Sequence, residues 1–341
     1  MIGRVVKTVV DKSRKEILSS EEKMRSFPVS IYYPTEETGT STMLELFKMV
    51  EEEIIHIFSL LEVERTKLEQ LITPFENNAT PVKNKAYPVV LLSPAFGLDR
   101  DLYVELITKI VESGYVVVTI SAPYDSIYTV FPNGELIYQT ESFPSLEEQI
   151  QIRVDDVQCV LAELEKWNKD SQFYGMFDLN KICGMGHSLG GATMYNLATI
   201  DSRIKCVVLL DASLHLINDN IPSVPVLNLR QEATTYKEYL EAIGSEQDSE
   251  RIATKYIENL KRLYDKLPNK QFIKVNGAQH LSFSTFANLI GEVPLQVTTT
   301  IQSLVVHYLN QNVKGIPAVF DQYIKEEIHF KQIDGLGNPI K

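Results

Sequence analysis

The stretch "ICGMGHSLGGAT" (182–193) holds Ser188 between Gly186 and Gly190. This spacing matches G-x-S-x-G, in which small flanking residues allow a sharp, strained turn that holds the serine hydroxyl clear of the backbone. The residues before the serine are typical of a strand and those after it of a helix, which is the order that a nucleophile elbow requires. The pattern predicts that Ser188 is a nucleophile and that Gly186 and Gly190 are the elbow glycines.

A serine hydroxyl is a weak nucleophile by itself, so Ser188 needs a general base. Of the six histidines, His280 in "VNGAQHLSF" lies in the loop just after the last predicted strand, where the carboxyl edge of a sheet brings side chains together. We therefore predict His280 as the base. The other histidines lie in the elbow, or on or after predicted helices: His56, His187, His215, His307 and His329.

The base needs an acid that orients it, and two carboxylates have the required chain order after the serine and before the histidine. Asp211, in "VVLLDAS", ends the strand that follows the elbow helix, and Glu232, in "NLRQE", ends the next strand. Asp211 emerges directly from an apolar strand, where a carboxylate needs partners, whereas Glu232 opens a polar region and could be solvated. The sequence favours Asp211, with Glu232 as the alternative.

Acyl transfer also needs two backbone N–H groups directed at the developing oxyanion. Leu189 supplies one because it directly follows the serine. The other is expected in the loop "SPAFG" (93–97) after the strand "PVVLL". Since proline has no N–H, the donor there is Phe96 or Ala95.

The strand-like segments indicate how these residues are positioned. Most of those after residue 87 are near-continuous apolar runs separated by helical patterns, which is typical of parallel strands buried on both faces. The sequence therefore predicts an α/β fold with a mostly parallel sheet of about eight strands and helices on both faces. The eight runs lie at 5–10, 27–34, 87–94, 114–121, 181–186, 205–212, 224–230 and 271–277.

Two segments exceed what a minimal α/β unit needs. Residues 41–75 have apolar side chains at helical spacing for one long helix or a helical pair, which we expect to cover a core edge or cap a cleft. Residues 231–270 are polar and helical and are expected at the rim of the site. We predict one domain over residues 1–341 with these two helical insertions.

Composition bounds the class of protein. The 341 residues are 44% hydrophobic, with no apolar run long enough to cross a membrane, and carry a formal net charge of -12, which disfavours nucleic acid as a partner. Basic residues interrupt the apolar N-terminus, which predicts no secretory signal and a cytoplasmic location. The three cysteines are too few and too scattered for a disulfide framework, and no Cys/His cluster has metal-site spacing. No metal or other cofactor is expected.

Together these motifs resemble the α/β-hydrolase superfamily and, within it, the platelet-activating-factor acetylhydrolase family (isoform II, plasma-type) and related bacterial esterases. The similarity runs through about residues 27 to 285. It is carried by "FPVSIYYP", "YPVVLLSPAFG", "ESGYVVVTIS", "IRVDDVQCVLAELEKW", "GMGHSLGGAT", "VVLLDAS" and "VNGAQHLSF".

The resemblance implies Ser188 as nucleophile, Asp211 and His280 as its partners, and the amides of Phe96 and Leu189 as the oxyanion hole. It thereby favours Asp211 over Glu232 a second time, because the family places its acid after the strand that follows the elbow helix. The family's oxyanion loop normally begins with His-Gly where this chain has Pro94-Ala95, and an aromatic residue is common where it has Ser213.

The predicted function is a metal-independent serine ester hydrolase that works through an acyl-enzyme. The resemblance implies a short or modified acyl chain on a lipid as substrate, and a small soluble ester is equally compatible. One alternative is a thioesterase, amidase or peptidase on the same fold. The other is a non-catalytic protein of this fold that binds a ligand or partner.

Overall fold

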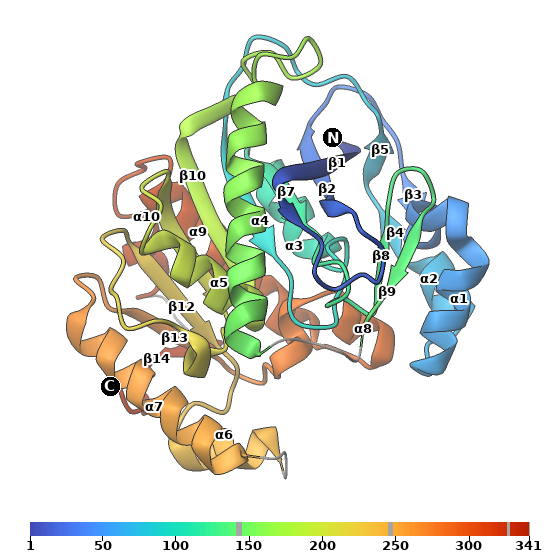
Figure 1. Ribbon diagram of the computed structural model, residues 1–341. Helices are drawn as coiled ribbons and strands as arrows, with labels where there is room; N and C mark the ends of the chain where they lie inside the picture. The colour runs from blue at the N-terminus through green and yellow to red at the C-terminus, as the bar shows by residue number, and fades with distance from the viewer. Residues whose placement is uncertain (141–144, 245–247, 326–327, 341) are drawn as a thin grey trace. The chain divides into compact units, whose positions relative to one another are not determined.

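The computed structural model, drawn in Figure 1, describes residues 1–140, 145–244, 248–325 and 328–340. The chain divides into two compact units. Unit 1 comprises residues 1–145, 155–179 and 284–292, and unit 2 comprises residues 146–154, 180–283 and 293–341. The single domain expected from the sequence stays a prediction.

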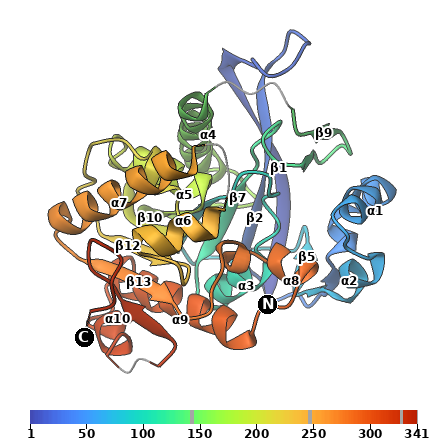
Figure 2. The same cartoon turned by 90° about the horizontal axis from the view of Figure 1, so that it is seen from below.

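Unit 1 contains five sheet strands in the order β6-β7-β2-β1-β5. β6 and β7 are parallel, and β2 lies antiparallel between β7 and β1. β1 and β2 run side by side as a long ribbon (Figure 2). The bounds are β1 (Ile2–Lys15), β2 (Met24–Pro34), β5 (Phe75–Asn77), β6 (Tyr87–Ser93) and β7 (Val116–Ile120).

The insertion at 41–75 is helical as predicted, but it is broken rather than continuous. It holds a 3-10 helix η1 (Leu44–Val50) and two helices, α1 (Glu51–Leu60) and α2 (Arg65–Gln70). The rings of Phe47 and Phe58 both pack on Tyr128, with centroids 5.4 and 5.9 Å away. In one straight helix these two residues would lie about 16 Å apart along the axis, so the chain has to bend between them.

Tyr128 belongs to the small hairpin of β8 (Tyr128–Val130) and β9 (Leu136–Tyr138), so the insertion packs on this hairpin within unit 1. Phe58 also lies 6.4 Å from Phe286 in α8. The remaining elements of unit 1 are β3 (Ser41–Thr42), β4 (Ile72–Thr73), α3 (Val104–Glu112), α8 (Phe286–Ile290) and the part of α4 (Leu146–Trp167) from residue 155 onward.

Unit 2 contains five strands in the order β14-β13-β12-β11-β10. The four from β10 to β13 are parallel, and β14 is antiparallel to β13. Most residues of the four parallel strands are buried, because helices cover both of their faces. The bounds are β10 (Phe177–His187), β11 (Ile204–Leu210), β12 (Val226–Arg230), β13 (Gln271–Val275) and β14 (Phe330–Gln332).

The helices of unit 2 lie on opposite faces of these strands (Figures 1 and 2). α5 packs on β11 and β10, where Gly184 leaves room for Met194, and α9 packs against β11 and β13. The insertion at 231–270 forms α6 and α7, as predicted. The bounds are α5 (Leu189–Ala198), η2 (Leu214–Leu216), α6 (Tyr236–Ile243), α7 (Ser249–Lys266), η3 (His280–Phe283), α9 (Leu295–Asn312) and α10 (Val319–Tyr323).

All eight predicted strand segments are strands in the structure. Unit 1 also contains β5 and unit 2 also contains β14, which the sequence did not reveal. Each has three residues, which is too short for a recognisable hydrophobic period.

A buried ion-pair cluster fastens the β1–β2 ribbon of unit 1. Arg25 on β2 is 3% exposed and donates to Glu16 Oε2 at 2.8 Å and to Asp156 Oδ2 at 2.6 Å. Arg14 on β1 donates to Asp156 Oδ1 at 2.7 Å. Removing one member of such a cluster leaves a buried charge without its partner.

We expect Arg25→Met to lower the free energy of unfolding by about 3 kcal/mol, because Glu16 and Asp156 each lose their contact with Arg25. Urea unfolding measures the change. Arg65→Met is the matched control, since Arg65 pairs with Glu51 and Glu69 on the surface and should leave the midpoint unchanged. Equal midpoints for the two variants would contradict the role given to Arg25.

Candidate active site

Ser188 lies in a strained turn between β10 and α5. Its φ of +53° and ψ of -118° fall in a backbone region that residues other than glycine rarely adopt. Backbone hydrogen bonds hold the turn, from Ser188 N–H to Leu210 O at 3.0 Å and from Gly191 N–H to Ser188 O at 3.0 Å. A Cβ at Gly186 would lie 2.1 Å from Gly190 O, so that position requires glycine.

Three predicted side chains of unit 2 meet at this turn. His280 Nε2 lies 3.0 Å from Ser188 Oγ, and His280 Nδ1 lies 2.6 Å from Asp211 Oδ2. The carboxylate can only accept, so Nδ1–H donates to Asp211 and the Ser188 hydroxyl donates to Nε2. The hydrogen-bonded series from acid to imidazole to hydroxyl is the arrangement that activates a serine.

The strand register explains why the three residues meet. His187 in β10 is level with Leu210 in β11, so the next residues, Ser188 and Asp211, leave the sheet at the same edge. His280 begins η3, five residues after β13 ends at the same edge. Its side chain is 43% exposed, whereas that of Asp211 is 1% exposed.

Asp211 is kept ionised in spite of its burial. Burial by itself would raise the pKa of this carboxyl, but Arg230 and His280 lower it to about 2. Arg230 Nη2 lies 3.0 Å from Oδ1, and the backbone N–H of Gln231 donates to the same oxygen at 3.2 Å. At neutral pH the acid is therefore a charged hydrogen-bond acceptor for His280.

Glu232, the alternative acid, makes other contacts. Its Oε1 lies 3.0 Å from Lys274 Nζ, and its Oε2 accepts from the backbone N–H of Gly277 at 2.7 Å. The Glu232 N–H donates to Ala278 O at 2.8 Å. Glu232 thus binds the loop that leads from β13 to His280, and the structure brings Asp211, not Glu232, to the imidazole.

The elbow histidine has a contact that sequence reasoning missed. His187 is fully buried, and its Nε2–H donates to the backbone carbonyl of His280 at 2.9 Å. Its ring lies 4.9 Å from the His280 ring and 5.9 Å from that of Phe283. Burial and the nearby His280 lower the pKa of His187 to about 3. No local signal in the sequence predicts this contact, because 93 residues separate the two histidines.

Ser213 lies beside the nucleophile. Its Oγ is 3.3 Å from Ser188 Oγ, and its N–H donates to the Ser188 carbonyl at 2.9 Å. The residue that differs from the family pattern is therefore adjacent to the hydroxyl that would react.

The loop after β6, in unit 1, contains the second predicted oxyanion donor. The N–H of Ala95, one of the two candidate donors, donates to Tyr103 Oη at 2.9 Å. Phe96 is in unit 1 and Leu189 in unit 2, and the oxyanion hole stays a prediction.

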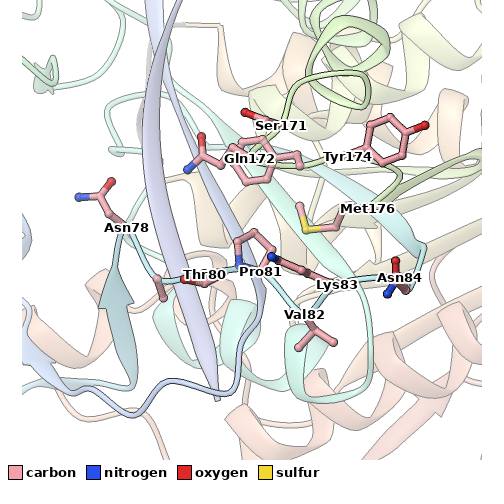
Figure 3. Close-up of a pocket in the computed structure, with 12 residues that line it drawn as sticks. Asn78, Thr80, Pro81, Val82, Lys83, Asn84, Ser171, Gln172, Tyr174 and Met176 are labelled. Carbon is pink, nitrogen blue, oxygen red and sulfur yellow. The ribbon is translucent and has the colours of Figure 1, made fainter.

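A surface pocket of about 460 Å³ in unit 1 contains none of the predicted site residues. Figure 3 shows Gln172 and Met176 on one side and Pro81 and Lys83 on the other. Most of its polar side chains are exposed, and its lining has no group of titratable residues. It offers no chemistry comparable with that at Ser188.

Within the described ranges, no three or more His, Cys, Asp or Glu side chains are grouped so that they could hold a metal ion. In the same part of the chain, no helix combines the length and apolar character needed to span a membrane.

A strained serine turn between a parallel strand and a helix, followed in the chain by an acid and a histidine, defines an α/β hydrolase. Residues 15–314 match the family described as platelet-activating factor acetylhydrolase, isoform II. The chain belongs to this family.

Two relatives and one solved structure show how far the similarity extends. The platelet-activating factor acetylhydrolases of Cavia porcellus and Canis lupus familiaris are 21% and 22% identical, over 82% and 77% of this chain. These matches cover 67% and 64% of the relatives, so the chain spans about two thirds of their length. A ferulic acid esterase from Streptomyces cinnamoneus has a TM-score of 0.70 at 20% identity, covering 93% of this chain and 91% of its own. The predicted α/β-hydrolase fold is confirmed.

The low pKa of His187 makes stability depend on pH. Because the folded value of about 3 lies below the ordinary 6.5, the unfolded chain binds the proton first. The contribution of neutral His187 to the free energy of unfolding is therefore fully present above pH 6.5. It is lost at about 1.4 kcal/mol per pH unit as the pH falls toward 3. We expect His187→Gln, which keeps a donor for His280 O, to flatten this decline in urea unfolding.

His56→Gln is the control, since His56 is exposed on α1 and should keep the wild-type slope. A wild-type slope in His187→Gln would show that His187 does not titrate between the folded and unfolded states.

Proposed function

We propose that the protein is a serine ester hydrolase in which Ser188 is the nucleophile, His280 the general base and acid, and Asp211 the acid that orients His280. The observation that carries the proposal is the series of hydrogen bonds from Asp211 through His280 to Ser188. Membership of an acetylhydrolase family supports it independently.

The reaction has two halves. Ser188 Oγ attacks the ester carbonyl carbon while His280 Nε2 takes the hydroxyl proton, and the tetrahedral intermediate collapses when Nε2 returns that proton to the alcohol. Water then attacks the acyl-enzyme with His280 again as base, which releases the carboxylic acid and restores Ser188. Asp211 remains ionised and stabilises the imidazolium in both halves.

The oxyanion is stabilised by backbone N–H groups, which we assign to Leu189 and Phe96. Leu189 is the first residue of α5, where amides have no carbonyl partner within the helix and the helix dipole favours negative charge. Membership of the family supports Phe96 as the second donor, because the family's pattern implies it.

We infer that the substrate is an ester with a short acyl group, because the relatives are acetylhydrolases by name. Ser213, next to Ser188, is a candidate for contact with the acyl group. A cytoplasmic location stays a prediction.

Ser188→Ala should abolish covalent labelling by a fluorophosphonate probe and lower the turnover of p-nitrophenyl acetate by at least ~1,000-fold, because no other group replaces the nucleophile. Labelling is read by intact-protein mass spectrometry. Ser59→Ala, at an exposed serine on α1, should label as the wild type does. The nucleophile assignment is wrong if Ser188→Ala still gains the mass of one probe.

A substrate series tests the reaction class. We expect kcat/KM to be highest for p-nitrophenyl acetate and to fall at least ~10-fold toward the octanoate, since methylenes that find no pocket lose binding in the transition state. Acetyl thioesters and acetanilides, measured in parallel, should react more slowly. A preference for the thioester or anilide would favour the thioesterase or amidase alternative. Absence of turnover with every substrate, in folded protein, would favour a binding protein.

A further inference from the structure

Arg230 is a buried cation directly beside the proposed catalytic acid. It is the last residue of β12 and has no exposed surface. Leu210 of β11 is level with Leu229 of β12, so Asp211 and Arg230 are lateral neighbours one residue further on. Arg230 Nη2 lies 3.0 Å from Asp211 Oδ1.

The guanidinium also holds the backbone on which Asp211 stands. Its Nη1–H donates to the carbonyl of Ala212 at 2.7 Å. Asp211 has a φ of +41°, a strained conformation that the surrounding contacts must maintain. The planar guanidinium of Arg230 therefore binds both the side chain of Asp211 and the peptide that follows it.

These contacts give the two oxygens of Asp211 different partners. Oδ2 faces His280, while Oδ1 accepts from Arg230 and from the Gln231 N–H. The carboxylate cannot rotate without losing one of them. The ring of Tyr256 lies 4.8 Å from the centre of the guanidinium, and the Tyr256 hydroxyl is fixed by Thr234 O at 3.0 Å.

We propose that Arg230 is a positioning residue that fixes Asp211 toward His280 and shifts the enzyme's working range to lower pH. The inference rests on the proposed function of the Ser188 site. Arg230 and a protonated His280 share one buried carboxylate. The positive charge of Arg230 therefore competes with a protonated imidazole for the same carboxylate, so the pH profile of the reaction is the readout that tests its role.

The other titratable groups around Asp211 and Arg230 leave Arg230 as the source of this effect. Lys274 on β13 is paired with Glu232, and Arg251 on α7 is paired with Asp248. Burial lowers the pKa of His187 on β10 to about 3 and that of His215 on η2 to about 4. Burial raises the pKa of Tyr256 on α7 to about 12, and Tyr239 on α6 stacks on its ring. Among these described groups, Arg230 is the permanently charged cation in contact with Asp211.

The test is the acid limb of the pH profile, measured for kcat/KM with p-nitrophenyl acetate and for the rate of fluorophosphonate labelling. Arg230→Met should lower kcat about 10- to 100-fold with KM within ~3-fold, and should move the acid limb up by about one pH unit. Arg230→Lys keeps the charge, so it should restore the wild-type limb while recovering only part of kcat, because it cannot bind Asp211 and Ala212 together.

Arg25→Met is the matched control, since it removes an equally buried, ion-paired arginine from unit 1. It should reduce stability and leave the acid limb in place. If Arg230→Met does not fold, Arg230→Gln, which retains donors for Asp211 but no charge, should show the same upward shift.

The results separate this inference from the proposed function. A wild-type acid limb in folded Arg230→Met or Arg230→Gln overturns it, as does an equal shift in Arg230→Lys or Arg25→Met. Failure of the wild-type protein to label at any pH, or labelling that persists in Ser188→Ala, overturns the proposed function instead.

Discussion

The carboxylate of Asp211 is 1% exposed at the edge of the unit 2 strands, and a charge in that position has to be matched by fixed partners. Arg230 supplies the opposite charge and His280 supplies the hydrogen bond. A buried pair of this kind contributes little net stability, because desolvating both ions offsets their attraction. Its value is orientation, since the shared carboxylate directs the His280 ring at Ser188.

The loop that bears His280 is fixed from two sides, which keeps the imidazole in place although it is nearly half exposed. His187 binds the His280 carbonyl from β10, and Glu232 binds the Gly277 and Ala278 backbone from the end of β12. Catalytic groups that are held before substrate arrives lose little entropy on reaction. The alternative acid candidate thus holds the loop that bears His280.

The helical insertions differ in how they relate to the site. α7 of the second insertion places Tyr256 on Arg230 and donates from Asn259 to Leu214 O in the segment after Asp211. This insertion lies beside the acid, as its position in the chain suggested. The first insertion packs on β8 and α8 within unit 1. Helical periodicity predicted both sets of helices, but which core each one covers depends on pairs such as Phe58 and Phe286, which no periodicity links.

The sequence by itself determined the eight main strands and the elbow, and it predicted Ser188, His280 and Asp211 as the site residues, because apolar runs, a glycine-flanked serine and the ends of strands are local signals. It left the acceptor of the Ala95 N–H open, gave no role to His187 or Arg230, and read Glu232 only as a rival acid. Those were decided by the tertiary structure, since each depends on a hydrogen bond or ion pair that no local pattern in the sequence predicts. Strand register alone brings Arg230 beside Asp211, and register is a property of the assembled sheet.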